Sequence, residues 1–435
     1  MKKKEVLKSI IVEFHSRNLP FVIDRKIDLP SNSNKIISVI GVRRSGKTYL
    51  LFKTMQNLIN SGVDKKRCIY INFEDERIDL TKEDLNLIFQ AYTELYSDID
   101  LKDTYLFFDE IQNVNGWEKF IRRIYDTITK NIFITGSNSK LLGNEIATSL
   151  RGRTIKYEVS PLTFKEFIKF KGFDFEFNID IYNAKKKVKL INLFKEFLIY
   201  GGFPEIPSMN KELKTLALQE YFNVMIYRDI VERYSIREPF ILKYFIKRVA
   251  ENITSTLSVN KKYNELKSQG IKISKNTLYD YLDYVETSFL VGLIKKHHSS
   301  VLKSELAEKK VYFVDNGLLN AIRSFNKTNF GALLENLIWH ELKAEYNNII
   351  FFKGKKECDF IVDNKIAIQV CYEFSSDLTK KREIEGLVEC CQYFSLKEGF
   401  IVTFDDEEEI SKENIDIHII PAYRFIDFNS IFNYM

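Results

Sequence analysis

The sequence predicts an α/β protein whose N-terminal part is a parallel β-sheet flanked by helices. Three observations predict this fold. Apolar runs alternate with amphipathic helical stretches through residues 36–170, a glycine-rich loop joins the first strand to the first helix, and two adjacent carboxylates end a later strand. Strands that alternate with helices in this way form a parallel sheet with helices on both faces.

Length and composition limit the classes to which the protein can belong. The 435 residues are too many for one hydrophobic core, so we expect two to four domains. Hydrophobic residues make up 45% of the chain and charged residues 29%, which is typical of a globular protein. The formal charge of +5 is small for this length and by itself indicates no partner.

Cysteine usage and hydropathy indicate a cytoplasmic protein. The five cysteines form no CxxC pair, which argues against a disulfide framework or a zinc site and favours a reducing compartment. No apolar run reaches the ~18–20 residues that span a membrane, so we expect no membrane association.

The pattern of apolar residues places the elements of the N-terminal part. The N-terminus mixes charged residues into its apolar stretch, which predicts an amphipathic helix and not a signal peptide. Further helices are predicted over residues 47–61 and 116–129. Strands are predicted over residues 36–41, 68–73, 104–109, 131–136 and 154–159.

The segment GVRRSGKT, residues 41–48, has the full eight-position pattern of a phosphate-binding loop between a strand and a helix. Gly41 and Gly46 permit turns that aim successive backbone N–H groups at one anion, next to a helix N-terminus. Lys47 would contact the terminal phosphates of ATP, and the Thr48 hydroxyl would coordinate Mg²⁺. The predicted ATP-binding residues are Gly41, Val42, Arg43, Arg44, Ser45, Gly46, Lys47, Thr48 and Tyr49.

The segment TYLFFDEIQ, residues 104–112, supplies the second half of the predicted site. It delivers two carboxylates at the carboxyl end of a buried strand, where open α/β sheets bind their ligands. Asp109 is predicted to hold Mg²⁺, and Glu110 to orient or deprotonate the attacking water. An acid at position 110 favours an ATPase over a nucleotide-binding switch.

Two further segments contain candidate catalytic residues. The strand NIFITG is followed by polar residues that could contact the γ-phosphate, of which Asn138 is the first choice and Ser137 the second. Helix capping by the same residues is the alternative. In the segment LRGR, Arg151 or Arg153 could reach an ATP bound by a neighbouring subunit, which would make the protein a homo-oligomer. A surface ion pair is the alternative for these arginines.

The middle of the chain carries a local basic excess. Residues 162–238 are predicted to be helical, with a break at the turn formed by residues 201–204. From residue 240 the order is helix, helix, turn, helix and hairpin, which is that of a winged helix-turn-helix. Residues 241–310 hold 13 basic and 7 acidic side chains, an excess of six that favours contact with DNA phosphates. Lys295, Lys296, His297 and His298 would lie in the wing.

The same region leaves an alternative open. The candidate recognition helix carries Asp280, Asp283 and Glu286, which are unfavourable beside phosphates. The winged helix could instead pack against the ATPase or a protein partner.

Segments spread over nearly the whole chain carry a resemblance to one family. They are GVRRSGKT, YINFEDERI, FFDEIQ, ITGSNSKLL, LRGR, PLTFKEF, YGGFPE, YRDIVERY, YFVDNGL, ENLIWHEL and ECDF. With these segments the sequence resembles the AAA+ ATPases of archaea and bacteria that carry a C-terminal half of unknown function. The resemblance implies an AAA+ P-loop core over residues 1–170, a helical lid over 171–238, a winged helix-turn-helix over 239–325 and a restriction-endonuclease-like PD-(D/E)XK domain over 326–435.

The C-terminal domain departs from the pattern of active nucleases. Glu335 and Asp359 match two of the acids that hold Mg²⁺ in such enzymes, but Gln369 and Cys371 stand where an acid and a lysine belong. We therefore expect this domain to keep the fold and to have lost cleavage. A lysine could still reach the site from another position, and the candidates are Lys353, Lys355, Lys356 and Lys365.

The expected function is Mg²⁺-dependent binding and hydrolysis of ATP that drives a conformational change in a DNA-associated protein. Two alternatives stay open. One is a signalling or defence ATPase that binds protein partners, and the other is an ATP-dependent nuclease.

Overall fold

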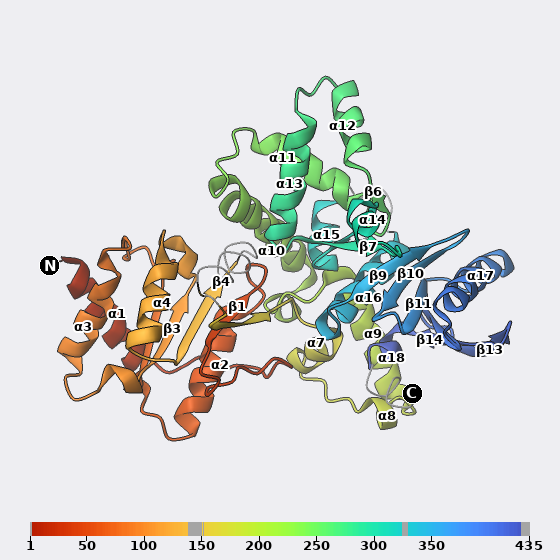
Figure 1. The fold of residues 1–435 in the computed structure, drawn as a ribbon. Coiled ribbons are helices and arrows are strands. Elements are labelled where there is room, and N and C mark those ends of the chain that lie inside the picture. The colour runs from red at the N-terminus through yellow and green to blue at the C-terminus, as the bar shows by residue number, and fades with distance from the viewer. Residues whose placement is uncertain (1, 138–149, 151, 324–328, 428–435) are drawn as a thin grey trace. The chain divides into compact units, whose positions relative to one another are not determined.

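The computed structural model describes residues 2–137, 150, 152–323 and 329–427 and is drawn in Figure 1. The chain divides into two compact units. Unit 1 comprises Met1–Ser160 with Thr287–Phe289, and unit 2 comprises Pro161–Glu286 with Leu290–Met435.

Unit 1 contains a sheet of five parallel strands in the order β2-β3-β4-β1-β5, which confirms the predicted parallel sheet. The predicted strands and helices of this region are all present. The strands are β1 Ile36–Ile40, β2 Cys68–Asn72, β3 Tyr105–Asp109, β4 Ile132–Gly136 and β5 Thr154–Glu158. The helices are α1 Lys2–Ser16, α2 Lys47–Asn60, α3 Leu87–Leu95 and α4 Trp117–Thr127.

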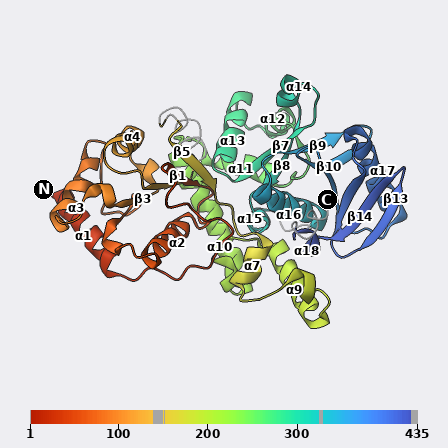
Figure 2. The same cartoon turned by 60° about the horizontal axis from the view of Figure 1, so that its bottom comes forward.

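Helices cover both faces of the unit 1 sheet. Successive side chains of a strand point to opposite faces, so neighbouring residues of β3 pack against different helices. Phe107 on β3 belongs to a core cluster with Leu51 and Met55 of α2. The next residue, Phe108, contacts Phe120 of α4, with ring centroids 6.2 Å apart. Figure 2 shows α2 and α4 on the two sides of the sheet.

The carboxyl ends of the five strands lie at one edge of the sheet, since all the strands run in the same direction. The loop after β1 and the end of β3 meet at this edge, and β4 lies between those two strands. Open α/β sheets bind their ligands at this edge. The topology therefore brings the glycine-rich loop and the two carboxylates of residues 109 and 110 together.

Unit 2 is built on a nine-stranded mixed sheet in the order β13-β14-β12-β11-β10-β9-β7-β8-β6. The pairs β11–β12, β12–β14 and β7–β9 are parallel, and the other pairs are antiparallel. The strands are β6 Thr256–Leu257, β7 Val291–Lys296, β8 Lys309–Phe313, β9 Ile349–Lys353, β10 Glu357–Val362, β11 Ile366–Cys371, β12 Glu398–Thr403, β13 Glu408–Lys412 and β14 Ile415–Pro421.

The helices of unit 2 agree with the predicted helical character of residues 162–238. Among the described residues, no helix is long and apolar enough to cross a membrane. The helices are α7 Phe164–Phe170, α8 Phe177–Asp180, α9 Ala184–Tyr200, α10 Lys211–Val224, a π-helix Met225–Glu232, α11 Pro239–Ala250, α12 Val259–Ser268, α13 Lys275–Thr287, α14 Val301–Leu306, α15 Asn316–Ile322, α16 Phe330–Glu345, α17 Asp377–Phe394 and α18 Ala422–Phe425.

The turn after α9 is fixed by a buried carboxylate. Gly201 has φ +69°, and a Cβ at this position would lie 2.1 Å from Asp315 Oδ2. The Gly202 N–H donates to the same oxygen at 2.6 Å, and Asp315 Oδ1 accepts from the Leu318 N–H at 2.9 Å. One side chain thus caps α15 and holds the glycine turn, which explains why the sequence breaks with two glycines here.

The region from residue 239 has the predicted order of helices, α11, α12 and α13. Ser274 caps α13, because the Thr277 N–H donates to Ser274 Oγ at 3.0 Å. β7 and β8 form the predicted hairpin, and β7 also pairs with β9 on its other side, so that the predicted wing is part of a continuous sheet. Lys295 and Lys296 are opposite residues of β9, and the His297 N–H donates to the Phe351 carbonyl at 2.8 Å.

The pairing of β7 with β9 also carries one sheet across the predicted boundary at residue 325. The winged helix, the nuclease-like fold and the predicted domain boundaries stay predictions.

Candidate functional site

The phosphate-binding loop joins β1 to α2 at the carboxyl edge of the unit 1 sheet. Gly41 has φ +149°, and a Cβ there would lie 2.1 Å from the carbonyl oxygen of Val159, so that only glycine fits. Further along the loop, Arg44 has φ 65° and Gly46, the N-cap of α2, has φ 100°. Left-handed residues that alternate with right-handed ones form a concave nest of N–H groups. The loop therefore has a backbone shape that binds an anion.

The side chains of the loop are donors that the protein satisfies only in part. Lys47 is 4% exposed, and its Nζ donates to the carbonyl oxygens of Gly41 at 3.1 Å and Val42 at 3.2 Å. Ser45 Oγ is buried and has no hydrogen-bond partner among the described residues. A buried hydroxyl without a partner costs about 1–3 kcal/mol, and an anion in the loop would remove this cost. The residues present therefore fit the phosphate groups of a nucleotide.

Asp109 lies at the end of β3, beside the first turn of α2. Its Oδ2 accepts hydrogen bonds from Thr48 Oγ1 at 2.8 Å and from the Tyr70 hydroxyl at 3.0 Å. Burial raises the pKa of Asp109 and the neighbouring Glu110 raises it further, while hydrogen bonds from three hydroxyl groups oppose the shift. The Thr48 hydroxyl and the Asp109 carboxylate thus lie together, as a Mg²⁺ site completed by phosphate oxygens and water requires.

These two residues would need the nucleotide to hold the ion. Within the described part of the chain, no group of three or more His, Cys, Asp and Glu side chains could hold a metal ion by itself. Mg²⁺ in nucleotide sites is typically held by one or two protein oxygens together with substrate phosphates.

Glu110 follows Asp109 in a left-handed backbone conformation, with φ 51°. Its Oε1 lies 3.4 Å from Lys47 Nζ, and Gln112 Nε2 donates to its Oε2. Burial opposes ionisation, but the charges of Lys47 and Arg43 outweigh it, so that the pKa of Glu110 lies below its ordinary value. Glu110 is therefore ionised at neutral pH and able to accept a proton.

Thr135 on β4 links the two carboxylates, and the sequence analysis did not identify it. Its Oγ1 accepts a hydrogen bond from the Glu110 N–H at 2.9 Å and donates to Asp109 Oδ1. Thr135 is fully buried. The signal that could have found it is a polar residue near the carboxyl end of an otherwise apolar strand. The sequence analysis also missed Tyr70 on β2, whose hydroxyl donates to Asp109.

Replacing Thr135 with valine is expected to destabilise unit 1 and to lower the rate of any ATP turnover. Valine has the same shape but leaves the buried Glu110 N–H without its acceptor and removes one donor to Asp109. The expected loss in the free energy of unfolding is about 1–3 kcal/mol, measured by chemical denaturation. Thr135→Ser keeps the hydroxyl and should retain most of this free energy. Equal stability of the two variants would contradict the assigned hydrogen bonds.

Two arginines, one before the loop and one within it, connect the loop to its surroundings. Arg25 donates to the Ser45 carbonyl at 2.8 Å and to the Ser160 carbonyl at 3.0 Å, so the segment before β1 holds the loop to the end of β5. Arg43 forms an ion pair with Glu74 at 2.6 Å.

Two predicted ATP-binding residues differ in exposure. Val42 is 1% exposed and could contact a phosphate only through its backbone. Tyr49 is 52% exposed in the first turn of α2, where its ring meets Phe52 edge-on at 6.0 Å. Both assignments stay predictions.

The remaining candidate catalytic residues are only partly described. Asn138 and Arg151 lie outside the described residues. Ser137 is fully buried at the end of β4. Arg153 Nε donates to Asp126 Oδ1 at 3.1 Å, which is the ion pair that the sequence left as an alternative. A role for either arginine at a neighbouring subunit stays a prediction.

The nuclease-like residues of unit 2 lie on α16, β10 and β11, as the resemblance implies. Cys371 is buried, and burial raises the pKa of its thiol to about 12, as expected for a core cysteine. A lysine does lie beside Glu335 and Asp359, and it is not one of the four candidates named from the sequence. Lys310 of β8 lies 3.2 Å from the first carboxylate and 2.9 Å from the second. The sequence analysis missed it because it lies on a strand before α16.

Comparisons with known proteins agree with the geometry of unit 1. A family profile described as an AAA domain matches residues 33–168, and one described as a domain of unknown function (DUF8612) matches residues 191–329. The uncharacterized protein MJ1544 of Methanocaldococcus jannaschii is 40% identical over 421 residues, which cover 93% of this chain and 91% of that protein. An uncharacterized protein of Haemophilus influenzae is 31% identical over 344 residues, 78% of this chain and 82% of its own length.

Among solved structures, the Aeropyrum pernix ORC1 protein in complex with DNA aligns with 73% of this chain and 91% of its own. The sequence identity is 12% and the TM-score is 0.31, which is too low to support any inference.

Proposed function

Because the chain belongs to the family that includes MJ1544 of Methanocaldococcus jannaschii, and residues 33–168 form its AAA domain, we propose that it binds ATP with Mg²⁺ and hydrolyses it. The observation that carries this proposal is the convergence of Lys47, Thr48 and the two carboxylates of residues 109 and 110 at one edge of the sheet. Phosphate release from ATP in the presence of Mg²⁺ tests it.

Each residue of the site has a distinct part in this proposal. Lys47 would exchange its present contacts with two carbonyl oxygens and Glu110 for phosphate oxygens, which are stronger acceptors. Glu110, no longer paired with the lysine, would then accept a proton from the attacking water. Thr48 and Asp109 would hold Mg²⁺, which neutralises charge on the phosphates.

The family resemblance implies a homo-oligomer in which an arginine reaches the neighbouring copy. Arg153 is engaged with Asp126 of its own unit and lies close to the ring of Tyr125. Because Arg153 is already engaged in this ion pair, Arg151 is the better candidate for the arginine that contacts ATP in a neighbouring subunit.

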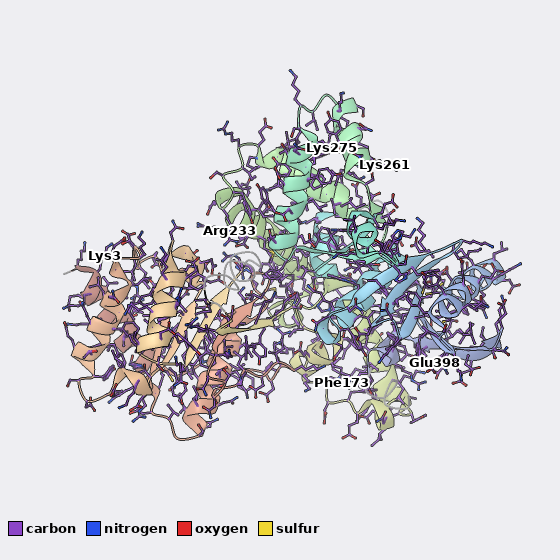
Figure 3. The ribbon with its side chains drawn as sticks, viewed as in Figure 1. Lys3, Phe173, Arg233, Lys261, Lys275 and Glu398 are labelled. Carbon is purple, nitrogen blue, oxygen red and sulfur yellow. The ribbon has the colours of Figure 1, made fainter. Side chains whose placement is uncertain are left out.

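We also propose that the protein contacts DNA, through the turn that joins α12 to α13. Exposed lysines lie along α12, in the turn and at the beginning of α13, at positions 261, 267, 272 and 275. Figure 3 marks Lys261 and Lys275 on this helix pair. The N-terminus of α13, which begins at Lys275, adds the positive end of a helix dipole, and this favours a phosphate. By contrast, Lys310, one of the 13 basic residues counted in this region, is 1% exposed and cannot contribute.

DNA binding is expected to weaken steeply with salt, because phosphate contacts release counterions. Replacing Lys272 and Lys275 with alanine should make the slope of log affinity against log salt shallower by about 1.8, since each phosphate contact contributes about 0.9. The matched control is the double replacement of Lys295 and Lys296 by alanine, which removes the same charge from β7 within the sheet. Fluorescence anisotropy with a labelled duplex measures both slopes.

Two outcomes would contradict the proposed surface. An equal change of the salt slope in the two double variants would show that DNA affinity depends only on the net charge of the protein and not on the position of the lysines. Absence of DNA binding at low ionic strength, with ATP present, would favour a protein partner for unit 2.

A further inference from the structure

A buried lysine lies among three carboxylates in unit 2. Lys310 Nζ lies 2.7 Å from Glu357 Oε1, 2.9 Å from Asp359 Oδ1 and 3.2 Å from Glu335 Oε1. The lysine comes from β8, and the carboxylates come from β10 and α16. One ammonium group therefore joins three elements that are separate in the sequence.

The ammonium group and the carboxylate oxygens that face it already have partners within the protein. An ammonium group has three N–H donors, and three carboxylate oxygens lie around this one. The second oxygen of Asp359 accepts from the Val370 N–H at 2.9 Å, and the Tyr312 hydroxyl donates to Glu335 Oε1 at 2.8 Å. A metal ion would have to displace the ammonium group to reach the same oxygens.

Gln369 provides no substitute for the missing acid. Its Oε1 accepts a hydrogen bond from the Asp359 N–H at 3.2 Å, and its Nε2 donates to Glu383 Oε2 at 2.6 Å. Both ends of the amide are engaged within the protein. Gln369 thus supports the backbone beside Asp359 and does not act as a free ligand.

The centre of the cluster is closed as well as occupied, whereas the Glu357 side chain at its rim is 36% exposed. The side chain of Lys310 is 1% exposed and that of Asp359 is 8% exposed, so a phosphodiester would have little access to either. Divalent cations bind carboxylate oxygens at roughly 2.0–2.6 Å, which requires the position that Nζ now holds between Glu335 and Asp359. The residues present therefore do not fit the Mg²⁺ that the nuclease resemblance implies.

We propose that Lys310 is the resident cation of this cluster, and that its ammonium group takes the place of a divalent metal ion. The three carboxylates surround one position, and a cation attached to the chain occupies it. A chelator cannot remove such a cation. The cluster then holds β8, β10 and α16 together at any metal concentration, and it supports no metal-dependent cleavage of phosphodiesters.

Wild-type protein gives the first test. Mn²⁺ or Ca²⁺ is titrated alone, without nucleotide, into wild type and Asp359→Asn, with calorimetry and thermal unfolding as readouts. The expected result is no binding that depends on Asp359, and an unfolding temperature of wild type that does not change with either ion. Binding to wild type that disappears in Asp359→Asn would overturn the proposal, as would Mg²⁺- or Mn²⁺-dependent DNA cleavage that disappears in the same variant.

Removing the lysine gives the second test. Lys310→Ala leaves the three carboxylates around an empty position, so Ca²⁺ should now bind there and raise the unfolding temperature by several degrees, as a ligand that binds only the folded state does. Ca²⁺ is chosen because its longer bonds and flexible coordination best suit this spacing. The double variant Lys310→Ala with Asp359→Asn should lose this rise.

A control lysine separates cation replacement from general destabilisation. Lys214 is 3% exposed and pairs with Glu196 elsewhere in unit 2. Lys214→Ala should be destabilised without acquiring any dependence on Ca²⁺. Folded Lys310→Ala that shows no response to Ca²⁺ would count against a cation position at this place. If Lys310→Ala does not fold, the comparison of wild type with Asp359→Asn still decides the question.

Discussion

Replacing Lys47 with alanine is expected to abolish measurable binding of ATP in the presence of Mg²⁺. Lys47 is the buried cation of the phosphate-binding loop, and its Nζ is held at the loop by the carbonyl oxygens of Gly41 and Val42. Charge-assisted contacts with phosphate oxygens are among the strongest that a side chain makes. We expect affinity to fall by at least about 100-fold, or about 2.7 kcal/mol, in calorimetric titrations with ATP.

The matched control is Lys53→Ala, which removes a lysine from the same helix. Lys53 pairs with Asp24 and is 29% exposed, away from the loop backbone. This variant should bind ATP as wild type does. Full ATP affinity in folded Lys47→Ala would show that the nucleotide binds elsewhere, and the assigned site would be wrong.

Replacing Glu110 with glutamine is expected to preserve ATP binding and to remove turnover. The amide keeps the shape of the side chain and can still accept hydrogen bonds from its neighbours, but it cannot accept a proton from water. General base catalysis contributes about 10²–10⁴-fold, so phosphate release should fall by this factor while the affinity measured by calorimetry stays close to that of wild type.

An exposed acid provides the control for Glu110→Gln. Glu76 lies in the turn after β2, in the same unit, and is exposed. Glu76→Gln should leave both affinity and turnover unchanged. If Glu110→Gln hydrolyses ATP at the wild-type rate, another group activates the water, and the role given to Glu110 would have to be abandoned.

Those residues of the unit 1 site that lie within one continuous segment could be predicted from the sequence. The loop from Gly41 to Thr48 is one segment with strict backbone requirements, and both carboxylates follow one apolar strand. The alternation of strands and helices then places both segments at one edge of a parallel sheet. These predictions depend only on local pattern and on topology.

The supporting residues could not be found in the same way. Thr135 and Tyr70 lie on different strands from Asp109 and meet it only because β4 and β2 are the neighbours of β3. Strand order is decided by tertiary packing, which the local pattern does not determine. The ion pair of Arg153 was predicted as an alternative, but its partner Asp126 could not be identified for a similar reason, since it lies on α4.

Unit 2 shows the same limit more strongly. The predicted wing followed from two strands that are adjacent in the sequence, but β7 also pairs with β9, beyond α16. Lys310 was counted as part of a basic surface, although it is among the most buried lysines of the described chain. A charged residue on a strand has no local signal that distinguishes a solvated position from a position inside a carboxylate cluster.

The most direct test of the proposed ATPase is phosphate release by wild-type protein, measured with Mg²⁺ and ATP in the absence of DNA and with duplex, junction or single-stranded DNA. Lys47→Ala and Glu110→Gln set the baseline. The proposal predicts release above this baseline that is lost when Mg²⁺ is removed, and that rises with at least one form of DNA. Wild-type protein that binds ATP but releases no phosphate above the baseline under all four conditions would contradict it.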